Sequence, residues 1–384
     1  MSTLVTGRLF SNIYNKVNII GFRKCSQKVG TAKWPKRIFS GIQPTGAIHL
    51  GNYMGAVARW VEYQNDNEHI TLSIVDMHSI TLPQDPVHLQ QNTLQMIATL
   101  IACGIDPEKS TLFLQSQVPQ HSGLCWVLMC LATMARLGHL PQYKEKSSKL
   151  KEIPLGLYVY PVLQAADILL YKATHIPVGE DQVQHLQLAQ DIAKTFNHRY
   201  GKTFPHPKAV VADDSSSRLK SLRDPTKKMS KSDPDPKSCI LLTDGPEMIR
   251  EKMKKAITDF TSELTYEPDA RPAIANLITM HSLITKKEPE VLVRENKNVT
   301  TGEYKLLVAE ELINLLNPIR EEMNQLMSDP AYLMKIITDG SEKAIHVAEQ
   351  TWTEVRNKVG LGGPDIIHNL RIQNKIQCNR SEER

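Results

Sequence analysis

One segment near the amino terminus combines polar side chains with glycines in a pattern suited to phosphate binding. Residues 40–52 read SGIQPTGAIHLGN, with His49 and Asn52 on either side of Gly51. The segment joins a predicted strand to a predicted helix. In a parallel sheet, ligands bind at such turns, where backbone amides favour phosphate oxygens. Both polar side chains could therefore meet phosphates while Gly51 allows close approach, although a structural role for His49 is the alternative on this segment alone.

A second segment of this kind lies far along the chain. Residues 224–234 read DPTKKMSKSDP, which brackets Lys227, Lys228, Lys231 and the hydroxyls of Ser230 and Ser232 with prolines. A loop of cationic and hydroxyl donors suits a polyphosphate whose negative charge grows as pyrophosphate departs. A solvated basic loop is the alternative interpretation.

The surrounding pattern predicts the elements that must position these segments. From about residue 36 to about residue 212, short β-branched runs alternate with amphipathic stretches, which is typical of a parallel sheet wrapped by helices. We expect strands at residues 37–40, 70–75, 111–114 and 174–178, with helices between them. After about residue 245 only helical patterns remain. The sequence therefore predicts an α/β fold, a Rossmann-like doubly wound parallel sheet, followed by an all-α carboxyl-terminal part.

Length and composition exclude several classes of protein. The chain has 384 residues, of which 41% are hydrophobic and 23% charged, so it is neither disordered nor fibrous, and its length favours two domains. No uninterrupted apolar run is long enough to span a bilayer, so we expect a soluble protein without membrane association. The six cysteines form no C-x-x-C pair, which argues against a structural metal or a disulfide framework.

The excess positive charge lies at the amino terminus. Residues 1–37 contain eight Lys and Arg residues and no acid, and the remaining 38 basic residues face 41 acidic ones. A basic, acid-free segment with Ser and Thr is typical of an import presequence. We therefore expect residues 1–36 to direct the chain to the mitochondrial matrix; a disordered basic arm that touches RNA is the alternative.

Several segments together resemble one enzyme family. The HLGN and KMSKS segments resemble the signature pair of class I aminoacyl-tRNA synthetases. Residues 39–46 (FSGIQPTG), 74–81 (IVDMHSIT), 165–171 (AADILLY) and 177–182 (PVGEDQ) look like the tryptophanyl-tRNA synthetases of bacteria and organelles. The resemblance covers about residues 37–365. It implies ATP-dependent activation of L-tryptophan to tryptophanyl-adenylate and transfer to tRNA(Trp), here in mitochondrial translation.

The resemblance also implies which residues handle the nucleotide. Stabilisation of charge on phosphate oxygens is implied to drive both reaction steps, and the residues implied to do so are Lys228, Ser230, Lys231, His49 and Asn52. The residues implied to bind ATP, which arrives with Mg²⁺, are Gln43, His49, Gly51, Asn52, Lys146, Gly179, Asp181, Leu219, Lys228, Met229, Ser230 and Lys231. For Lys146, a Lys-rich surface helix is the alternative.

Tryptophan selection needs an apolar slot with one polar feature, because the indole has a single N–H donor. Asp167 interrupts an apolar run, and a buried carboxylate requires donor partners. The resemblance implies that Asp167 accepts the indole N–H; a charge on a helix surface is the alternative. The residues implied to form the tryptophan pocket are Phe39, His78, Tyr160, Gln164, Asp167, Val178 and Gln182.

Three rival functions follow from the same residues. Gln164 stands where the bacterial enzymes usually have Met, and the spacing Gln-x-x-Asp is similar to that of tyrosyl-tRNA synthetases, so a tyrosine-specific enzyme of the same fold is the nearest alternative. A small nucleotidyltransferase with a similar turn is the second. A non-catalytic RNA-binding relative is the third.

The resemblance implies a division of the chain and a quaternary structure. We expect a presequence (1–36), a catalytic domain that includes the KMSKS loop (37–244), a helical anticodon-binding domain (245–365) and a flexible tail (366–384). A homodimer is implied by resemblance alone. By residue type, the candidates for RNA contact are Tyr332, Trp352, Arg356, Lys252, Lys254 and Lys255, with packing of the aromatics and solvation of the lysines as alternatives.

Overall fold

The computed structural model describes residues 34–148, 150–211 and 219–362. The predicted presequence, apart from residues 34–36, and the predicted tail lie outside these residues. The described residues from Pro35 onward form one compact unit.

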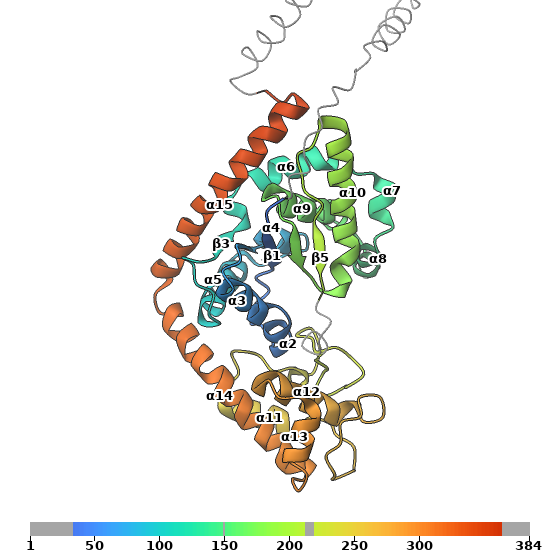
Figure 1. Cartoon of the computed structure of the whole chain (residues 1–384), viewed down its shortest axis with the longest axis vertical. Coiled ribbons are helices and arrows are strands. Elements are labelled where there is room, and N and C mark those ends of the chain that lie inside the picture. Colours follow the sequence, from blue (N-terminus) through green and yellow to red (C-terminus); the bar gives the residue numbers. More distant parts are fainter. Residues whose placement is uncertain (1–33, 149, 212–218, 363–384) are drawn as a thin grey trace, which may run out of the picture. The chain divides into compact units, whose positions relative to one another are not determined.

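A five-stranded parallel sheet forms the centre of the amino-terminal half, with the strands in the order β3-β2-β1-β4-β5. The strands are β1 (Ile38–Ile42), β2 (Ile70–Ile74), β3 (Thr111–Leu114), β4 (His175–Pro177) and β5 (Lys208–Val210). Helices connect and cover them (Figure 1). The predicted fold class, an α/β doubly wound parallel sheet followed by helices, is confirmed.

The alternation of side chains along β1 explains how two cores form. Ile38 packs into a cluster with Ile70 and Leu72, whereas Phe39 packs into a second cluster with Phe113. Successive side chains of a strand point to opposite faces, so each face of the sheet has its own core. All of β2 is buried, as expected for a strand inside a parallel sheet.

Three of the predicted strands have shifted boundaries, and one strand was not predicted. The first strand extends to Ile42, because Val75 continues the pairing by donating its N–H to the Ile42 carbonyl at 2.9 Å. The edge strand β5 was not among the predicted strands. Lys208 and Ala209 are exposed there, so no apolar pattern marks this segment.

Short helical segments surround the site and longer helices cover the sheet. The segments of the amino-terminal half are α2 (Leu50–Asn52), η1 (Tyr53–Val57), α3 (Ala58–Asn65), α4 (Asp76–Ser79), α5 (Pro86–Ala102), η2 (Gln115–Gln117), α6 (Gln120–Met129), α7 (Met134–Gly138), α8 (Pro141–Ser147), α9 (Leu155–Leu170), η3 (Glu180–Gln182) and α10 (Val183–Tyr200). The chain from α2 to α3 is continuously helical, with a π-helical stretch at η1, a feature often found beside functional sites.

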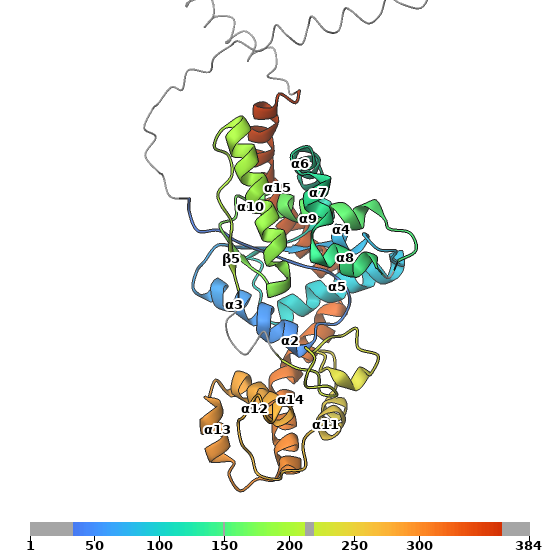
Figure 2. The same ribbon diagram turned by 90° about the vertical axis from the view of Figure 1, so that its right-hand side faces the viewer.

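Beyond Gly245 the described residues form only helices and their connections. They are α11 (Pro246–Lys254), α12 (Pro272–Thr285), α13 (Pro289–Glu295), α14 (Thr301–Met327) and α15 (Pro330–Val359), preceded by the short turn η5 (Pro236–Ser238). Helices α11 and α12 pack against α14, and α13 packs against α12 (Figures 1 and 2). A complete capping box at Thr300 and Glu303 starts α14.

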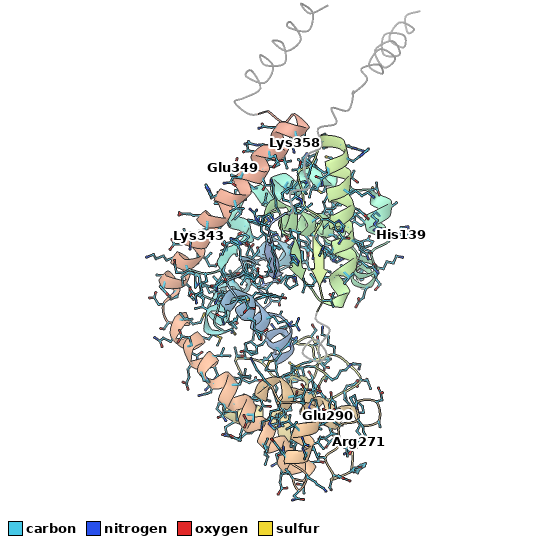
Figure 3. The ribbon with its side chains drawn as sticks, viewed as in Figure 1. His139, Arg271, Glu290, Lys343, Glu349 and Lys358 are labelled. Carbon is cyan, nitrogen blue, oxygen red and sulfur yellow. The ribbon has the colours of Figure 1, made fainter. Side chains whose placement is uncertain are left out.

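The last helix returns to the sheet. Helix α15 lies along β3 and α6 (Figure 1), and a Cβ placed on Gly340 would lie only 1.8 Å from the Leu112 carbonyl oxygen. Lys343, Glu349 and Lys358 are spaced along this helix (Figure 3) and bond to the Pro107 carbonyl, the Gln120 amide and the Thr203 hydroxyl, respectively. The helical part and the sheet therefore share α15.

Candidate active site

A cavity of about 570 Å³ opens at the carboxyl ends of β1, β2 and β4. Its lining includes Gln43 after β1, Val75 after β2 and Gly179 after β4. This is the crevice where the strand order reverses, which is the usual ligand position in open parallel sheets. The volume lies within the range of small-molecule and nucleotide sites.

The turn after β1 depends on two glycines. Gly46 has a φ of 95°, a conformation that glycine adopts readily, and a Cβ there would lie 2.5 Å from Lys231 Nζ. A Cβ on Gly51 would lie 3.0 Å from His49 Cε1. His49 caps α2, since its Nδ1 accepts from the Asn52 N–H at 3.3 Å. The glycines thus let a lysine and an imidazole approach the backbone closely.

The electrostatic state of His49 follows from its surroundings. Burial, followed by the positive charges of Lys228 and Lys231, lowers the pKa of His49 from 6.5 to about 4. The ring is therefore neutral near pH 7. Because Nδ1 accepts from a backbone N–H, the ring proton lies on Nε2. His49 is thus a neutral donor whose Nε2–H could serve a phosphate oxygen.

Backbone pairing joins the two chemistry-bearing segments. The Met229 N–H donates to the Leu219 carbonyl at 2.9 Å, which folds the KMSKS loop back on the chain that precedes it. Further along, the Leu50 N–H donates to the Ile240 carbonyl at 2.8 Å, and the Leu242 N–H donates to the Ile48 carbonyl at 2.9 Å. The chain after the loop thereby pairs with the HLGN turn, so the structure brings both segments together.

The loop has a cationic face and an apolar back. Lys228 and Ser230 are exposed, and the Lys231 ammonium donates to the Thr45 carbonyl in the turn after β1. Met229 and Leu219 are buried in the core. The Met229 amide is already paired, so Met229 and Leu219 support the loop through packing, while the lysines and Ser230 are the groups able to meet phosphates.

The predicted nucleotide residues divide between the cavity and its rim. Gln43, Asn52, Gly179 and Asp181 line the cavity, whereas the KMSKS residues and His49 do not. Lys146 lies in α8, the helix that also carries the cavity residues Gln142 and Glu145.

All seven residues predicted to contact tryptophan line the cavity. They are Phe39, His78, Tyr160, Gln164, Asp167, Val178 and Gln182. One wall is apolar, since Phe39 stacks on Tyr171 with ring centroids 5.5 Å apart and an interplanar angle of 11°.

Asp167 is a buried acid in the cavity wall that accepts three hydrogen bonds from neighbouring side chains. The residue is 2% exposed, and its oxygens accept from Gln115 Nε2 at 2.7 Å, His121 Nδ1 at 2.6 Å and His78 Nε2 at 2.8 Å. Burial alone would raise the pKa of Asp167, but the hydrogen bonds from His121 and His78 outweigh it and hold the pKa well below its usual range. The carboxylate is therefore ionised, and its position on the cavity wall excludes a helix-surface role.

A second polar network lies beside the end of β4. Tyr160 donates its hydroxyl to Gln142 Oε1 at 2.9 Å, and Gln142 Nε2 donates to Asp181 Oδ2 at 2.9 Å. Gln182 Nε2 also donates to Asp181 Oδ2, at 2.7 Å, and Gln164 Nε2 donates to Gln182 Oε1 at 3.3 Å. Burial, aided by Asp181, raises the pKa of Tyr160 to about 12, which keeps its hydroxyl protonated. Tyr160, Gln164 and Gln182, three of the residues predicted to contact tryptophan, thus belong to one hydrogen-bond network with Asp181.

Gly179 permits the conformation of Asp181, because a Cβ at residue 179 would lie 2.7 Å from Asp181 Oδ1. Asp181 is exposed at the cavity rim, where a carboxylate can accept from hydroxyl groups.

Sequence reasoning missed several residues of the site. Gln115 and His121 support Asp167 without lining the cavity, while Gln142, Glu145 and Trp60 line it. Gln115 follows directly after β3, and that position was a usable signal, since the carboxyl ends of parallel strands meet at one edge. No comparable signal marks Gln142 or Glu145, which project from a short surface helix.

The candidate RNA contacts of the helical part need one correction. Lys252 is buried, and its ammonium donates to Asp244 Oδ2 at 2.6 Å and to the Cys239 carbonyl at 2.9 Å. It anchors the chain that pairs with the HLGN turn, so it is not a phosphate contact. Trp352 packs on Gly123, and Arg356 lies over its ring at 5.7 Å, as the packing alternative predicted for this aromatic residue.

The described residues show neither a membrane-spanning helix nor a cluster of metal-binding side chains. No described helix is long and apolar enough to cross a membrane. Within residues 34–148, 150–211 and 219–362, no group of three or more His, Cys, Asp or Glu side chains could hold a metal ion.

A doubly wound sheet with HLGN and KMSKS segments adjoining at its carboxyl edge defines a class I aminoacyl-tRNA synthetase. Residues 31–317 match the family described as tRNA synthetases class I (W and Y). The tryptophan–tRNA ligase of Caldanaerobacter subterraneus subsp. tengcongensis is 43% identical over 326 residues, which cover 85% of this chain and 98% of the relative.

Two further relatives agree with this match. The mitochondrial tryptophan–tRNA ligase of Caenorhabditis elegans is 42% identical over 365 residues, covering 93% of this chain and 99% of the relative. The crystal structure of tryptophanyl-tRNA synthetase from Campylobacter jejuni complexed with ADP and tryptophan has a TM-score of 0.74 and 31% identity, covering 85% of this chain and 100% of that one. The chain belongs to the tryptophan–tRNA ligases of the class I family.

Proposed function

We propose that the chain activates L-tryptophan with ATP to tryptophanyl-adenylate and transfers it to tRNA(Trp). The observation that carries this proposal is the buried Asp167 carboxylate in the cavity wall, which is held by three donors. An indole N–H that enters the slot can donate to this carboxylate. An analogue without the N–H leaves the buried carboxylate one hydrogen bond short, so it should bind more weakly.

Tryptophan is favoured over tyrosine by the shape and chemistry of the slot. The Phe39 ring, backed by the stacked Tyr171 ring, offers a flat apolar wall for a bicyclic ring. Gln164 stands where Met is usual in the bacterial enzymes, and in this proposal it acts on the amino-group side through its bond to Gln182 rather than on the ring.

In the activation step, a carboxylate oxygen of tryptophan attacks the α-phosphorus and pyrophosphate departs. The charge that develops on the phosphate oxygens is stabilised by Lys228, Ser230 and Lys231, with the neutral His49 and Asn52 as further donors. Lys231 exchanges the Thr45 carbonyl for a phosphate oxygen. Mg²⁺ enters as part of the ATP substrate, held by the phosphates.

The remaining nucleotide contacts in this proposal involve residues at or near the rim of the cavity. Asp181 accepts from the ribose hydroxyls, with Gly179 giving the ribose room and Gln43 and Gly51 adjoining the nucleotide. In this proposal Lys146 meets the pyrophosphate end, on the grounds that α8 borders the cavity.

The chain acts as a homodimer in this proposal. Large apolar side chains are exposed on neighbouring elements beside the site, at Ile80, Trp126, Met134 and Leu155. The segments that carry Ile80, Met134 and Leu155 adjoin one another, since the Tyr158 hydroxyl donates to the Met134 carbonyl and a Cβ on Gly156 would lie 3.7 Å from Thr81 Cα. A contiguous apolar patch of this kind is typical of a subunit interface.

We further propose that residues 1–36 are a mitochondrial presequence, residues 37–244 the catalytic domain, residues 245–365 the anticodon-binding domain and residues 366–384 a tail. The support is the basic, acid-free amino terminus and the similarity to the mitochondrial ligase of C. elegans. Import of a reporter fused to residues 1–36 into isolated mitochondria tests the location, and a reporter left outside would refute it.

ATP–pyrophosphate exchange by the full chain, with tryptophan and tyrosine in parallel, tests the activity. We expect exchange that depends on tryptophan and is at least about a thousandfold less efficient with tyrosine. Efficient exchange with tyrosine would establish the nearest rival, and no exchange with either would favour the non-catalytic one.

A further inference from the structure

The Asp167 carboxylate has one unused acceptor position. A carboxylate offers about four lone-pair sites, two on each oxygen. Oδ1 accepts from both Gln115 and His121, at 2.7 and 2.6 Å, while Oδ2 accepts from His78 at 2.8 Å. The remaining site is therefore on Oδ2. Since Asp167 lines the cavity, that site is available to a donor that enters it.

A buried relay behind the carboxylate fixes its orientation. His121 is fully buried, and its other ring nitrogen, Nε2, lies 2.9 Å from the Tyr171 hydroxyl. The ionised carboxylate can only accept, so His121 Nδ1 carries a proton, and in the neutral form of the ring Nε2 accepts from the Tyr171 O–H. Burial and Asp167 raise the pKa of Tyr171, which keeps that hydroxyl protonated. Asp167 and Tyr171 thus together favour this tautomer of His121.

Neither His121 nor Gln115 belongs to the cavity lining, and the Tyr171 ring lies behind Phe39, stacked on it. The ring of Phe113 packs against both members of the relay, with centroids 5.8 Å from His121 and 5.4 Å from Tyr171. His121 therefore acts on a substrate only through Asp167, and the Tyr171 hydroxyl acts only through His121.

We propose that His121 and Tyr171 are positioning residues that aim the free lone pair of Asp167 Oδ2 into the cavity and so determine the preference for an amino acid with a ring N–H donor. The inference rests on the proposed role of Asp167 in binding tryptophan. It adds two residues outside the cavity to the determinants of specificity.

The test compares two nearly isosteric substrates in ATP–pyrophosphate exchange by the full chain. One is L-tryptophan and the other is β-(benzothiophen-3-yl)-L-alanine, in which sulfur replaces the N–H. The readout is the ratio of their kcat/KM values. A general loss of structure lowers both values, whereas loss of carboxylate orientation lowers only that for tryptophan.

Three variants separate the members of the relay. Tyr171→Phe leaves His121 Nε2 without a donor, and we expect the ratio to fall about three- to tenfold. His121→Leu removes a donor from Asp167, and we expect a fall of at least about tenfold. His121→Asn keeps an N–H for Asp167, so its ratio should stay within about threefold of wild type. Adding Tyr171→Phe to His121→Asn should change the ratio no further.

The chain contains a matched control. In the helical part, Nδ1 of buried His281 is hydrogen-bonded to the Tyr304 hydroxyl at 2.9 Å, away from the cavity. Tyr304→Phe thus removes an equivalent buried hydrogen bond. We expect a comparable loss of stability and a substrate ratio within about twofold of wild type.

An unchanged ratio in Tyr171→Phe, an equal fall with Tyr304→Phe, or a further fall when Tyr171→Phe is added to His121→Asn would overturn the inference even if His121→Leu fails to fold. Asp167→Asn in the same assay distinguishes failure of the positioning role from failure of the proposed indole contact. If Asp167→Asn abolishes the preference but the relay variants do not, the positioning role alone is wrong. If Asp167→Asn also leaves the ratio unchanged, the proposed indole contact is wrong.

Discussion

Two titratable side chains at the site are buried, and one of them is ionised while the other is neutral. Asp167 stays ionised because His121, His78 and Gln115 donate to it, although burial opposes the charge. His49 stays neutral because burial disfavours its charge and nearby lysines add to that effect. Full ionisation near the indole and neutrality near the phosphates are what the two proposed roles require.

The neutrality of His49 gives a pH dependence of stability with a defined sign. Its folded pKa of about 4 lies below the unfolded value of 6.5, so between these values the unfolded chain binds a proton that the folded chain does not. The contribution of His49 to stability is therefore complete above pH 6.5 and is lost as the pH falls toward 4. Relative to His49→Gln, wild type should lose about 2 kcal/mol more between pH 7 and pH 4.5 in urea unfolding. Equal losses in both proteins would contradict this.

At the residue scale, sequence patterns identified what faces the cavity better than what supports it. Asp167 was found because an acid interrupts an apolar run, and its burial is confirmed. His121 was missed because its contact with Asp167 is a tertiary contact between α6 and α9. The hydrophobic periodicity of a sequence does not predict which helices pack together. The error at Lys252 has the same cause, since Asp244 and the Cys239 carbonyl bury a lysine that looks like a surface charge.

At the scale of elements, the basic loop is held by the helical part. Asn276 on α12 accepts from the Lys220 N–H at 2.8 Å and donates to the Lys220 carbonyl at 3.0 Å, at the stem of the loop. Sequence patterns predicted the helices and the loop, but this side-chain link between them requires tertiary structure.

We expect Asn276→Ala to lower kcat in ATP–pyrophosphate exchange about tenfold or more, with little change in tryptophan affinity, because the loop loses its position. Asn197→Ala is the control, because Asn197 makes equivalent bonds to the Thr203 and Phe204 backbone away from the loop. Both variants should lose about 1–3 kcal/mol of stability. A similar fall of kcat in both would argue against a specific role for the Asn276 link.

Close packing of α15 on β3 makes a second prediction about elements. Gly340→Ala would place a methyl group against the Leu112 carbonyl, so we expect it to destabilise the fold by about 3 kcal/mol. At Gly302 in α14 a Cβ would meet nothing within 4 Å, so Gly302→Ala should stabilise by about 0.5–1 kcal/mol. Urea unfolding measures both. A neutral Gly340→Ala would show that the helix is not packed on the strand as described.

At the scale of the whole molecule, the exposed apolar patch makes assembly testable. Met134→Glu and Leu155→Glu each place a charge in the patch and should shift the full chain toward monomer in light scattering. Met248→Glu is the control, because Met248 is an exposed methionine on α11. If all three proteins match wild type in mass, the patch is not the subunit interface.

Hydrophobic periodicity was enough to predict the parallel sheet and the helical carboxyl-terminal third. It did not predict that α15 would cover β3, because an amphipathic pattern shows that a helix has an apolar face but not which element that face packs against. The edge strand β5 and the cavity volume likewise depend on three-dimensional packing.

In the proposed complex, one cavity holds the indole against Asp167 while the basic loop meets the phosphate of the same adenylate. A crystal structure of the full chain with a non-hydrolysable tryptophanyl-adenylate analogue would show both contacts at once. We expect the indole nitrogen about 3 Å from Asp167 Oδ2, with Lys228 or Lys231 hydrogen-bonded near the phosphate position. An indole outside the cavity, or an Asp167 that still contacts only Gln115, His121 and His78, would contradict it.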